Sequence, residues 1–159
     1  MLLKGIIAED FLQYKKPCMV LEFPHCSFKC DVECGESVCQ NGELALKPNI
    51  EFKIETICKI FINNDISKAI CCQGLEPFDS WDNLYTLIKT IRFIYHIENE
   101  IIIYTGYSKN EIKNKVKLLS LIPNIIIKFG RYIPNSNKVF DKILGIYLAS
   151  YNQYAERIS

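Results

Sequence analysis

The sequence lacks long apolar segments, an excess of charge of one sign and a leader-like N-terminus. No apolar run approaches the roughly 18 residues that a membrane-spanning helix requires, so we expect no membrane association. Lys and Arg number 19 against 18 Asp and Glu, which excludes the basic footprint of a dedicated nucleic-acid-binding protein. Charge interrupts the N-terminus after three residues, which excludes the apolar stretch of a signal peptide. These absences predict a cytoplasmic protein.

Cys-x-x-Cys pairs are also absent, although the chain contains eight cysteines. A disulfide framework is typical of small secreted chains, whereas 159 residues are enough to bury a core without such cross-links. Structural zinc sites usually combine two close pairs of ligands separated by a longer loop. The cysteines of this chain match neither of these two patterns closely.

Four of the eight cysteines fall within 14 residues, at Cys26, Cys30, Cys34 and Cys39. A continuous loop of thiolates suits an iron–sulfur cluster, whose iron atoms lie at the corners of a body a few ångströms across. From spacing alone we favour an iron–sulfur cluster, then zinc, then a redox loop without metal. The other four lie among apolar neighbours, and we interpret them as small buried core residues: Cys18, Cys58, Cys71 and Cys72.

Short apolar runs alternate with helical periodicity along the chain. The runs predict strands over 18–23, 69–72, 100–104 and 125–129, with a further apolar run over 144–149. The periodicity predicts helices over 49–62 with Asn49 as N-cap, over 80–95 with Ser80 as N-cap, and after a capping box over 108–111. The alternation predicts one α/β domain over residues 1–159, with a mostly parallel sheet of βαβ units covered by helices.

Unusual residues follow four of the predicted strands. The cysteine loop follows the first, and Gly74–Pro77, Thr105–Tyr107 and Gly130–Tyr132 follow the next three. Because ligands collect at the carboxyl ends of parallel strands, we expect one site there. Each segment also has an ordinary interpretation: Glu76 as a solvated turn residue, and Arg131 as a surface arginine rather than a bidentate partner of a carboxylate or phosphate.

Five motifs in order resemble the radical S-adenosylmethionine (SAM) activating enzymes, specifically the small activating proteins of anaerobic (class III) ribonucleoside-triphosphate reductase. The resemblance runs from about Met19 to Ile158. The family pattern is Cys-x3-Cys-x2-Cys-aromatic-Asn, Gly-Gly-Glu-Pro, Trp/Tyr-Thr-Gly-Tyr, Asp-Gly-x-Phe-Ile and Gly-Ser-Ser-Asn-Gln. The matching segments here are Cys26-x3-Cys30 with Cys39-Gln40-Asn41, Gly74-Leu75-Glu76-Pro77, Tyr104-Thr105-Gly106-Tyr107, Lys128–Ile133 and Ala149–Gln153.

The chain departs from this pattern at several positions. Glu33 occupies the place of the third cysteine, and an apparent insertion follows it. We favour Cys39 as the third ligand because Gln40-Asn41 continues the family motif after it, with Cys34 as the alternative. Further replacements are Leu75 for the second glycine of the turn, Gln40 for the aromatic residue and Phe129 for the aspartate of Asp-Gly.

The resemblance implies a fold and two cofactors. The fold is a partial, incomplete TIM-like barrel of the small radical SAM type. Cys26, Cys30 and Cys39 would ligate a [4Fe–4S] cluster and leave one iron open to the amino and carboxylate groups of SAM. The residues implied to bind SAM are Gly74, Leu75, Glu76, Pro77, Thr105 and Asn152, with Gln153 near the nucleoside or the partner.

The resemblance also implies a reaction and partners. An electron from a low-potential donor such as flavodoxin would cleave SAM to methionine and a 5′-deoxyadenosyl radical. That radical would take a hydrogen atom from a glycine in the large subunit of anaerobic ribonucleotide reductase. Two alternatives remain open: a zinc-stabilised binding module, which would lose its fold with a chelator, and a radical SAM enzyme that acts on a small molecule.

Overall fold

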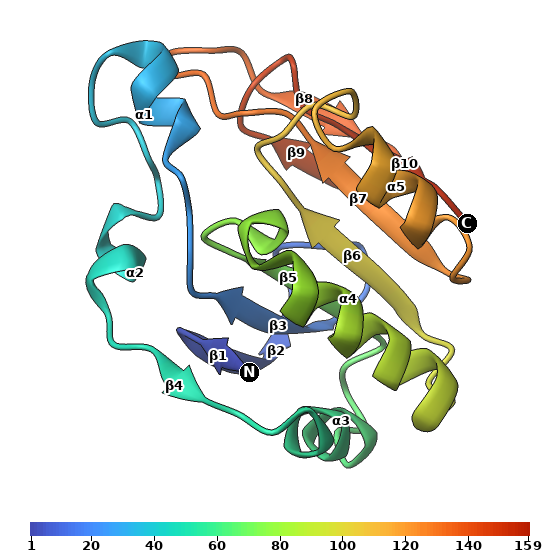
Figure 1. The fold of residues 1–159 in the computed structure, drawn as a ribbon. Coiled ribbons are helices and arrows are strands. Elements are labelled where there is room, and N and C mark those ends of the chain that lie inside the picture. Colours follow the sequence, from blue (N-terminus) through green and yellow to red (C-terminus); the bar gives the residue numbers. More distant parts are fainter.

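Four parallel strands form the centre of the molecule (Figure 1). In the computed structural model, which describes residues 1–159, they lie in the order β7-β6-β5-β3, and one antiparallel strand is added at each edge. The bounds are β2 (Gly5–Asp10), β3 (Cys18–Phe23), β5 (Ala69–Gly74), β6 (Glu100–Tyr104), β7 (Ile125–Phe129) and β10 (Tyr154–Arg157). The predictions of an α/β protein and a mostly parallel central sheet are confirmed.

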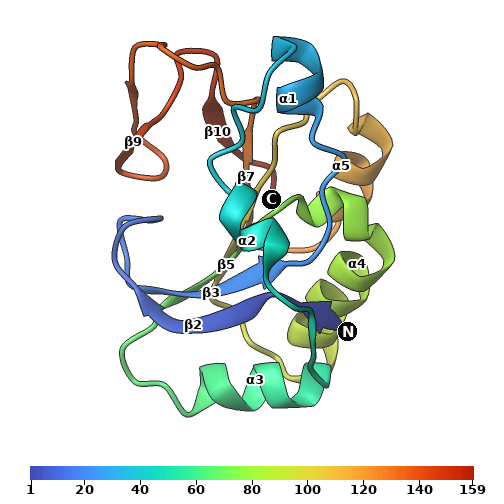
Figure 2. The same cartoon turned by 90° about the vertical axis from the view of Figure 1, so that its left-hand side faces the viewer.

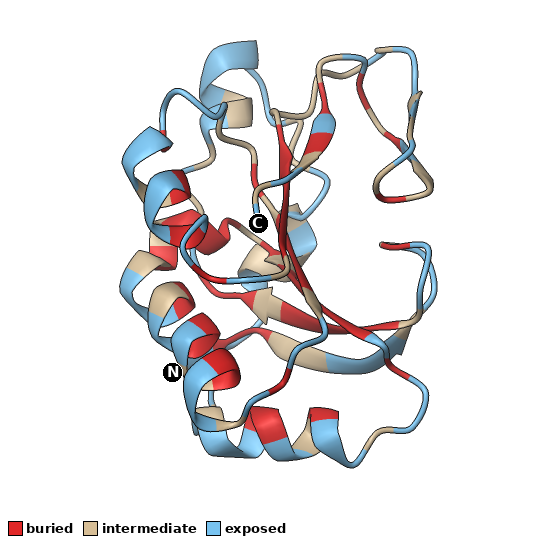
Figure 3. Ribbon diagram, turned by 90° about the vertical axis from the view of Figure 1, so that its right-hand side faces the viewer, coloured by how far each residue is buried: buried red, intermediate tan, exposed pale blue.

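The longer helices all pack on one face of this sheet. Alternate strand residues point to opposite faces, and one set, which includes Leu21, Ile70 and Ile103, joins the buried residues of the helices in the larger core. The helical segments are α3 (Ile54–Ile62), η1 (Pro77–Ser80), α4 (Trp81–Lys89), η2 (Thr90–Ile94) and α5 (Lys113–Leu119). The central strands are buried on both faces (Figure 3).

Loops and a hairpin, rather than helices, cover the other face. Val20, Cys71 and Ile102 belong to a smaller core together with Leu144 and Leu148. The hairpin pairs β8 (Val139–Asp141) with β9 (Ile146–Leu148), and a further small sheet pairs β1 (Leu2–Leu3) with β4 (Ile50–Glu51). The apolar run over 144–149 therefore forms part of this hairpin, outside the central sheet (Figure 2). The helical cover expected on the sheet is confined to one side.

The first predicted helix starts later than its sequence pattern indicates. It begins at Ile54, so Asn49 is not its N-cap. Met1 and Phe52 exchange two hydrogen bonds: the Phe52 N–H donates to the Met1 carbonyl (2.8 Å) and the N-terminal ammonium donates to the Phe52 carbonyl (2.6 Å). These bonds hold the segment before the helix in an extended conformation beside the N-terminus.

The second predicted helix is present, but it has three parts. A 3₁₀ turn leads into α4, and a π turn continues it to Ile94. Ser80 precedes α4 as predicted, yet its hydroxyl makes no capping bond and is buried without a hydrogen-bond partner.

The capping box forms only in part. The Ser108 N–H and hydroxyl both donate to the Glu111 carboxylate, at 2.8 and 2.9 Å. The reciprocal bond is missing because the Glu111 N–H donates to the Ser108 backbone carbonyl. The helix therefore begins two residues after the box, at Lys113.

Candidate functional site

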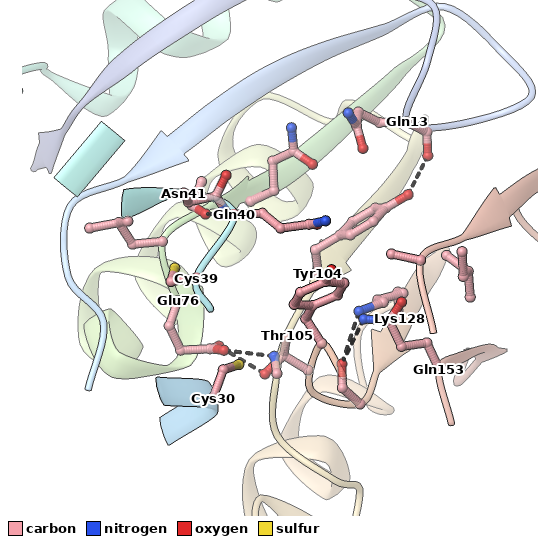
Figure 4. A pocket seen from close by; sticks show the side chains of 18 of the residues that line it. Gln13, Cys30, Cys39, Gln40, Asn41, Glu76, Tyr104, Thr105, Lys128 and Gln153 are labelled. Atoms are coloured by element: carbon pink, nitrogen blue, oxygen red, sulfur yellow. Dashed lines mark hydrogen bonds between the residues drawn. The ribbon is translucent and has the colours of Figure 1, made fainter. Parts of the chain in front are cut away.

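The carboxyl ends of the four parallel strands surround one cavity of about 430 Å³. This volume lies in the range of about 300–1,000 Å³ that is typical of ligand sites. Its walls come from the loop after β3 and from the ends of β5, β6 and β7 (Figure 4). The prediction that these four segments share one rim is confirmed. Residues singled out from the sequence that line it are Cys26, Cys30, Cys39, Gly74, Leu75, Glu76, Thr105 and Gln153.

Three of the four clustered cysteines line this cavity. Cys34 does not: it is exposed at the end of α1 (Lys29–Cys34) and lines a neighbouring cavity. The structure thus places Cys39, rather than Cys34, on the same wall as Cys26 and Cys30. The four remaining cysteines are buried, as predicted: Cys18, Cys58, Cys71 and Cys72.

Burial favours the protonated form of two of these thiols, Cys26 and Cys39. Burial raises the pKa of Cys26 to about 12, although a hydrogen bond from the Phe28 N–H (3.2 Å) acts to lower it. The pKa of Cys39 is also raised, chiefly by burial. A thiol must lose its proton to ligate a metal, so these two sulfurs stay neutral until a positive metal centre takes the place of the proton.

The donor set fits an iron–sulfur cluster in type and number. No three His, Cys, Asp or Glu side chains converge closely enough to hold a single metal ion. Thiolates that bind different irons of a [4Fe–4S] cluster stand at separate corners of a larger body. Three thiols spread along one cavity wall are therefore suited to such a cluster.

An aspartate closes the insertion between Cys30 and Cys39. One carboxylate oxygen of Asp31 accepts hydrogen bonds from the backbone N–H groups of Val38 (2.9 Å) and Cys39 (2.8 Å). Gly35 follows the last residue of α1; its φ of +73° lets the chain reverse, and its N–H donates to the Asp31 carbonyl (2.9 Å). This local geometry returns the chain across the insertion and brings Cys39 to the cavity.

The rest of the cysteine loop contributes nothing to the core. Neither α1 nor α2 (Gly42–Leu46) contains a buried residue. Asn41, just before α2, donates from its side-chain amide to the Gly74 carbonyl (2.8 Å). Polar contacts of this kind, rather than packing, attach the loop to the end of β5.

The turn after β5 requires glycine at its first position. Gly74 has a φ of +97°, and a Cβ there would lie 2.8 Å from the Cα of Glu22 and the N of Phe23. Leu75, which stands for the second glycine of the family motif, lines the cavity. Pro77 is buried at the start of η1 and does not line the cavity.

Glu76 is buried, so its interpretation as a solvated turn residue is wrong. Its side chain accepts three hydrogen bonds: Oε1 from the Phe78 N–H (3.1 Å) and the Thr105 hydroxyl (2.8 Å), and Oε2 from the Gly106 N–H (2.8 Å). Burial raises the pKa of Glu76 to about 7, although these hydrogen bonds act to lower it. Glu76 thus connects the turn after β5 to the end of β6, and Oε2 accepts only one of the three hydrogen bonds.

The end of β6 also anchors the start of the cysteine loop. Thr105 is buried, and its hydroxyl accepts a hydrogen bond from the Tyr107 N–H (3.0 Å). The Tyr107 hydroxyl donates to the Asp79 carboxylate, which also accepts from the Ser27 N–H (2.6 Å). These contacts position the backbone next to Cys26.

Arg131 binds a carboxylate bidentately, but the carboxylate belongs to the protein. Two guanidinium nitrogens donate to Glu111 at 2.9 and 2.5 Å, and Nε lies 3.2 Å from a carboxylate oxygen of Glu33. Glu33, at the position of the family's third cysteine, is therefore part of an ion-pair network at the surface.

The structure separates Asn152 from the other predicted SAM-binding residues. Asn152 lines the neighbouring cavity and donates to the Arg131 carbonyl (2.9 Å). Gln153 does line the main cavity, where its side-chain amide donates to the Gly130 carbonyl (3.2 Å).

Tyr104 and Lys128 line the cavity, and neither was predicted as a site residue although both lie within segments matched to the family motifs. Tyr104 donates its hydroxyl to the Gln13 carbonyl (2.6 Å) and so ties the loop after β2 to the cavity. Lys128 is buried and lines the cavity. A signal for Lys128 exists in the sequence, because it is the one charged residue in the apolar strand over 125–129.

Comparison with known proteins identifies the kind of domain. A family model for 4Fe-4S single cluster domains matches residues 18–151, which include the cysteine loop and all four parallel strands. The chain belongs to this family. Its cofactor is accordingly a 4Fe-4S cluster, in agreement with the preference for iron and sulfur over zinc. Neither the curated proteins nor the solved structures contain a match to the chain, and none of its helices has the length and apolar character needed to cross a membrane.

Proposed function

We propose that this chain is a radical SAM activating enzyme whose cluster is held by Cys26, Cys30 and Cys39. One observation carries the proposal: these three thiols share a cavity with the turn after β5 and with the end of β6. We further propose that residues 1–159 form one domain and that its sheet is the incomplete TIM-like barrel of the small radical SAM type. Helices confined to one face of the sheet support that assignment.

The cavity supplies a recognition group for the amino end of SAM. Oε2 of Glu76 accepts only from the Gly106 N–H and retains an acceptor position for an ammonium group. Oε2 and the Cys30 sulfur both lie within 4 Å of the point where a Cβ of Gly106 would stand, at 3.6 and 3.9 Å. The ammonium acceptor is thus next to a proposed cluster ligand.

A bound cluster would supply one electron to SAM. The bond between the SAM sulfur and C5′ would then break, giving methionine and a 5′-deoxyadenosyl radical. The protein would orient SAM and restrict water in the cavity. The proposed hydrogen donor is a glycine in the large subunit of anaerobic ribonucleotide reductase, and flavodoxin is the proposed electron donor.

The mouth of the cavity is suited to a protein substrate. Leu12 and Tyr147 line the cavity, yet their side chains are exposed on opposite loops, after β2 and in the β8–β9 hairpin. Exposed apolar side chains at a cavity mouth favour contact with another protein. All eight cysteines are free, which agrees with the reducing conditions of the cytoplasm, our proposed location.

Product analysis tests the proposal. The protein is reconstituted anaerobically with iron and sulfide, reduced with dithionite and mixed with SAM, and 5′-deoxyadenosine is measured by liquid chromatography. We expect the product from the wild-type protein and from Cys34→Ala, and none from Cys39→Ala. A loaded cluster that forms no 5′-deoxyadenosine would contradict the radical SAM assignment, and activity in Cys39→Ala but not Cys34→Ala would overturn the ligand assignment.

The protein substrate is tested separately. With the large reductase subunit present, the proposal predicts a glycyl-radical doublet by electron paramagnetic resonance (EPR). Cleavage of SAM that never produces this doublet, but proceeds with a small molecule, would favour the alternative radical SAM activity.

A further inference from the structure

A row of polar side chains crosses the face of the sheet that the β8–β9 hairpin covers. Each of the four parallel strands contributes one residue, in register, to the smaller core: Val20, Cys71, Ile102 and Ile126. The residues two positions further along the strands point to the same face, and all of them line the cavity: Glu22, Gln73, Tyr104 and Lys128. The apolar layer of this face therefore ends in a polar layer at the cavity.

Glu22 is the member of this row whose side chain has no partner. Tyr104 and Lys128 each donate to a backbone carbonyl, at 2.6 and 3.0 Å. Gln73 accepts a hydrogen bond from the Cys71 thiol (3.9 Å). The Glu22 carboxylate takes part in none of the ion pairs of the structure, although the residue is half-buried. A carboxylate withdrawn from water is costly unless it is paired, so this position indicates a cationic ligand.

A glycine on the neighbouring strand leaves space for this carboxylate. Gly5 of β2 pairs with Glu22 of β3 in the antiparallel register. A Cβ at Gly5 would stand 2.8 Å from Oε2 of Glu22, which is closer than unbonded atoms of these types approach. The carboxylate therefore lies against the bare backbone of the edge strand, where any larger side chain would displace it.

The mouth of the cavity opens onto the same face of the sheet. The loop after β2 and the β8–β9 hairpin face each other there (Figure 2), and each contributes an exposed apolar side chain, Leu12 and Tyr147. Apolar side chains exposed at a cavity mouth favour contact with another protein. A protein segment that enters between these two loops reaches the face on which Glu22 lies.

We propose that Glu22 binds a basic side chain of the protein segment that donates the hydrogen atom. Arginine fits best, because its guanidinium group donates two parallel hydrogen bonds to one carboxylate. The inference rests on the proposed function, which makes another protein the substrate. The ammonium group of SAM is not the partner, since that group is assigned to Glu76, which follows the end of β5 and bonds to the end of β6.

Two peptides that differ only in charge test the inference. Each has a central glycine, alanine at its ends, and between them either arginine or citrulline, which is the neutral isostere of arginine. Their binding to the reconstituted protein with SAM is measured anaerobically by fluorescence anisotropy. The wild-type protein should bind the arginine peptide about tenfold or more tightly, because only arginine forms a charge-assisted pair with Glu22. Glu22→Gln should bind both peptides equally.

Further variants separate recognition from structure. Glu22→Lys should reverse the preference, so that a peptide with glutamate in place of arginine binds more tightly than the arginine peptide. Gly5→Ala displaces the carboxylate but keeps its charge, and it should reduce the preference for arginine only in part. Glu43→Gln removes an exposed carboxylate of α2 that does not line the cavity, and it should leave the preference unchanged. Iron content and circular dichroism of each variant are measured first.

Three results would overturn the inference alone. A wild-type protein that binds the arginine and citrulline peptides equally, or binds neither, has no cationic subsite. A preference for arginine that survives Glu22→Gln belongs to another residue. Weaker binding of SAM by Glu22→Gln, measured by equilibrium dialysis, would place Glu22 in the SAM site instead. A wild-type protein that holds its cluster but forms no 5′-deoxyadenosine from SAM would contradict the proposed function, and with it the inference.

Discussion

The cysteine loop and the strand-end rim that faces it are held in place by different means. None of residues 26–46 is buried, and both helices of this segment are short. On the rim, Glu76, Thr105 and Lys128 are all buried at the ends of strands that form the core. The loop therefore takes its shape from a few polar contacts and from what it binds, whereas the fold itself sets the rim.

This difference suggests separate roles for the two regions: the rim would recognise a ligand and the cysteine loop would hold the cluster. The groups proposed to recognise a ligand, Glu76 and Thr105, lie just after strand ends, where the core fixes their positions. The cysteines lie on a segment whose exposed backbone can be reached by iron and sulfide, and a bound cluster adds the contacts that the segment lacks. Substitutions in the loop should therefore reduce cluster retention, whereas substitutions on the rim should reduce the stability of the fold.

Removal of a proposed ligand thiol should give the largest effect, on cluster retention and not on the stability of the fold. Cys39→Ala should reduce the iron retained after reconstitution and desalting to near background, while the melting temperature of the apoprotein stays unchanged because Cys39 contributes nothing to the core. Iron analysis and circular dichroism measure the two quantities.

Two other cysteines provide the controls. Cys34→Ala should retain the cluster, since Cys34 does not line the cavity. Cys58→Ala should do the reverse of Cys39→Ala, with a lower melting temperature and a retained cluster, because Cys58 is buried on α3. If Cys39→Ala retained iron and Cys34→Ala lost it, Cys34 rather than Cys39 would be the third cluster ligand.

Alanine at two glycines compares the regions directly. Gly74→Ala should lower the free energy of unfolding by about 2 kcal/mol or more, since strain at φ +97° adds to contacts of 2.8 Å with the backbone of β3. Gly35→Ala, at φ +73° with no atom within 4 Å of the new Cβ, should cost only about 1 kcal/mol. Urea unfolding of the apoproteins gives both values, and equal losses would refute the distinction.

Asp31 should control how firmly the loop holds its cluster. Asp31→Ala removes the acceptor of two backbone hydrogen bonds near Cys39, so we expect iron loss to a chelator to be about tenfold faster. Asp31→Asn keeps an acceptor oxygen and should restore most of the retention. Glu36→Ala, in the same exposed segment, serves as the matched control. Equal rates of iron loss in Asp31→Ala and Glu36→Ala would show that Asp31 does not stabilise the bound cluster.

The smallest effect concerns acid stability, far from the cluster. Burial acts to raise the pKa of Glu100, but hydrogen bonds from Lys16, Arg157 and Tyr14 outweigh it and lower the pKa to about 2. The unfolded chain then binds this proton at higher pH than the folded protein, so the stabilisation is complete above about pH 4.5 and is lost as the pH falls toward 2.

Glu100→Gln should therefore flatten the decrease in unfolding free energy between pH 4.5 and 2, as measured by urea unfolding of the apoprotein. Glu100 lies at the start of β6, at the opposite end from the cavity, so iron retention at neutral pH should not change. An unaltered pH dependence of stability, or a loss of iron at neutral pH, would contradict the prediction that Glu100 affects acid stability but not the cluster.

The sequence predicts the centre of the fold better than its edges. The four parallel strands are buried on both faces, so each is a mostly apolar run, and the predicted bounds are close to those observed. Strands β2 and β10 lie at the edges and contain few buried residues. Their positions depend on pairing with a neighbouring strand, which leaves no apolar pattern to recognise.

The site, like the edges of the sheet, could be predicted only where a local sequence pattern marks it. Its four segments could be predicted because each directly follows a strand. The burial of Glu76 could not, since it depends on Thr105 and Gly106 from the next strand along the sheet. The position of Asn152 could not be predicted from its order along the chain either, because tertiary contacts direct it to the neighbouring cavity.

EPR of the dithionite-reduced, reconstituted protein, with and without SAM, tests the central claim most directly. The account predicts a reduced [4Fe–4S] signal that changes shape when SAM is added, since an iron left open by three thiolates accepts the ligand. A [4Fe–4S] signal that is the same with and without SAM would contradict the account, and would leave an iron–sulfur domain without the proposed activity.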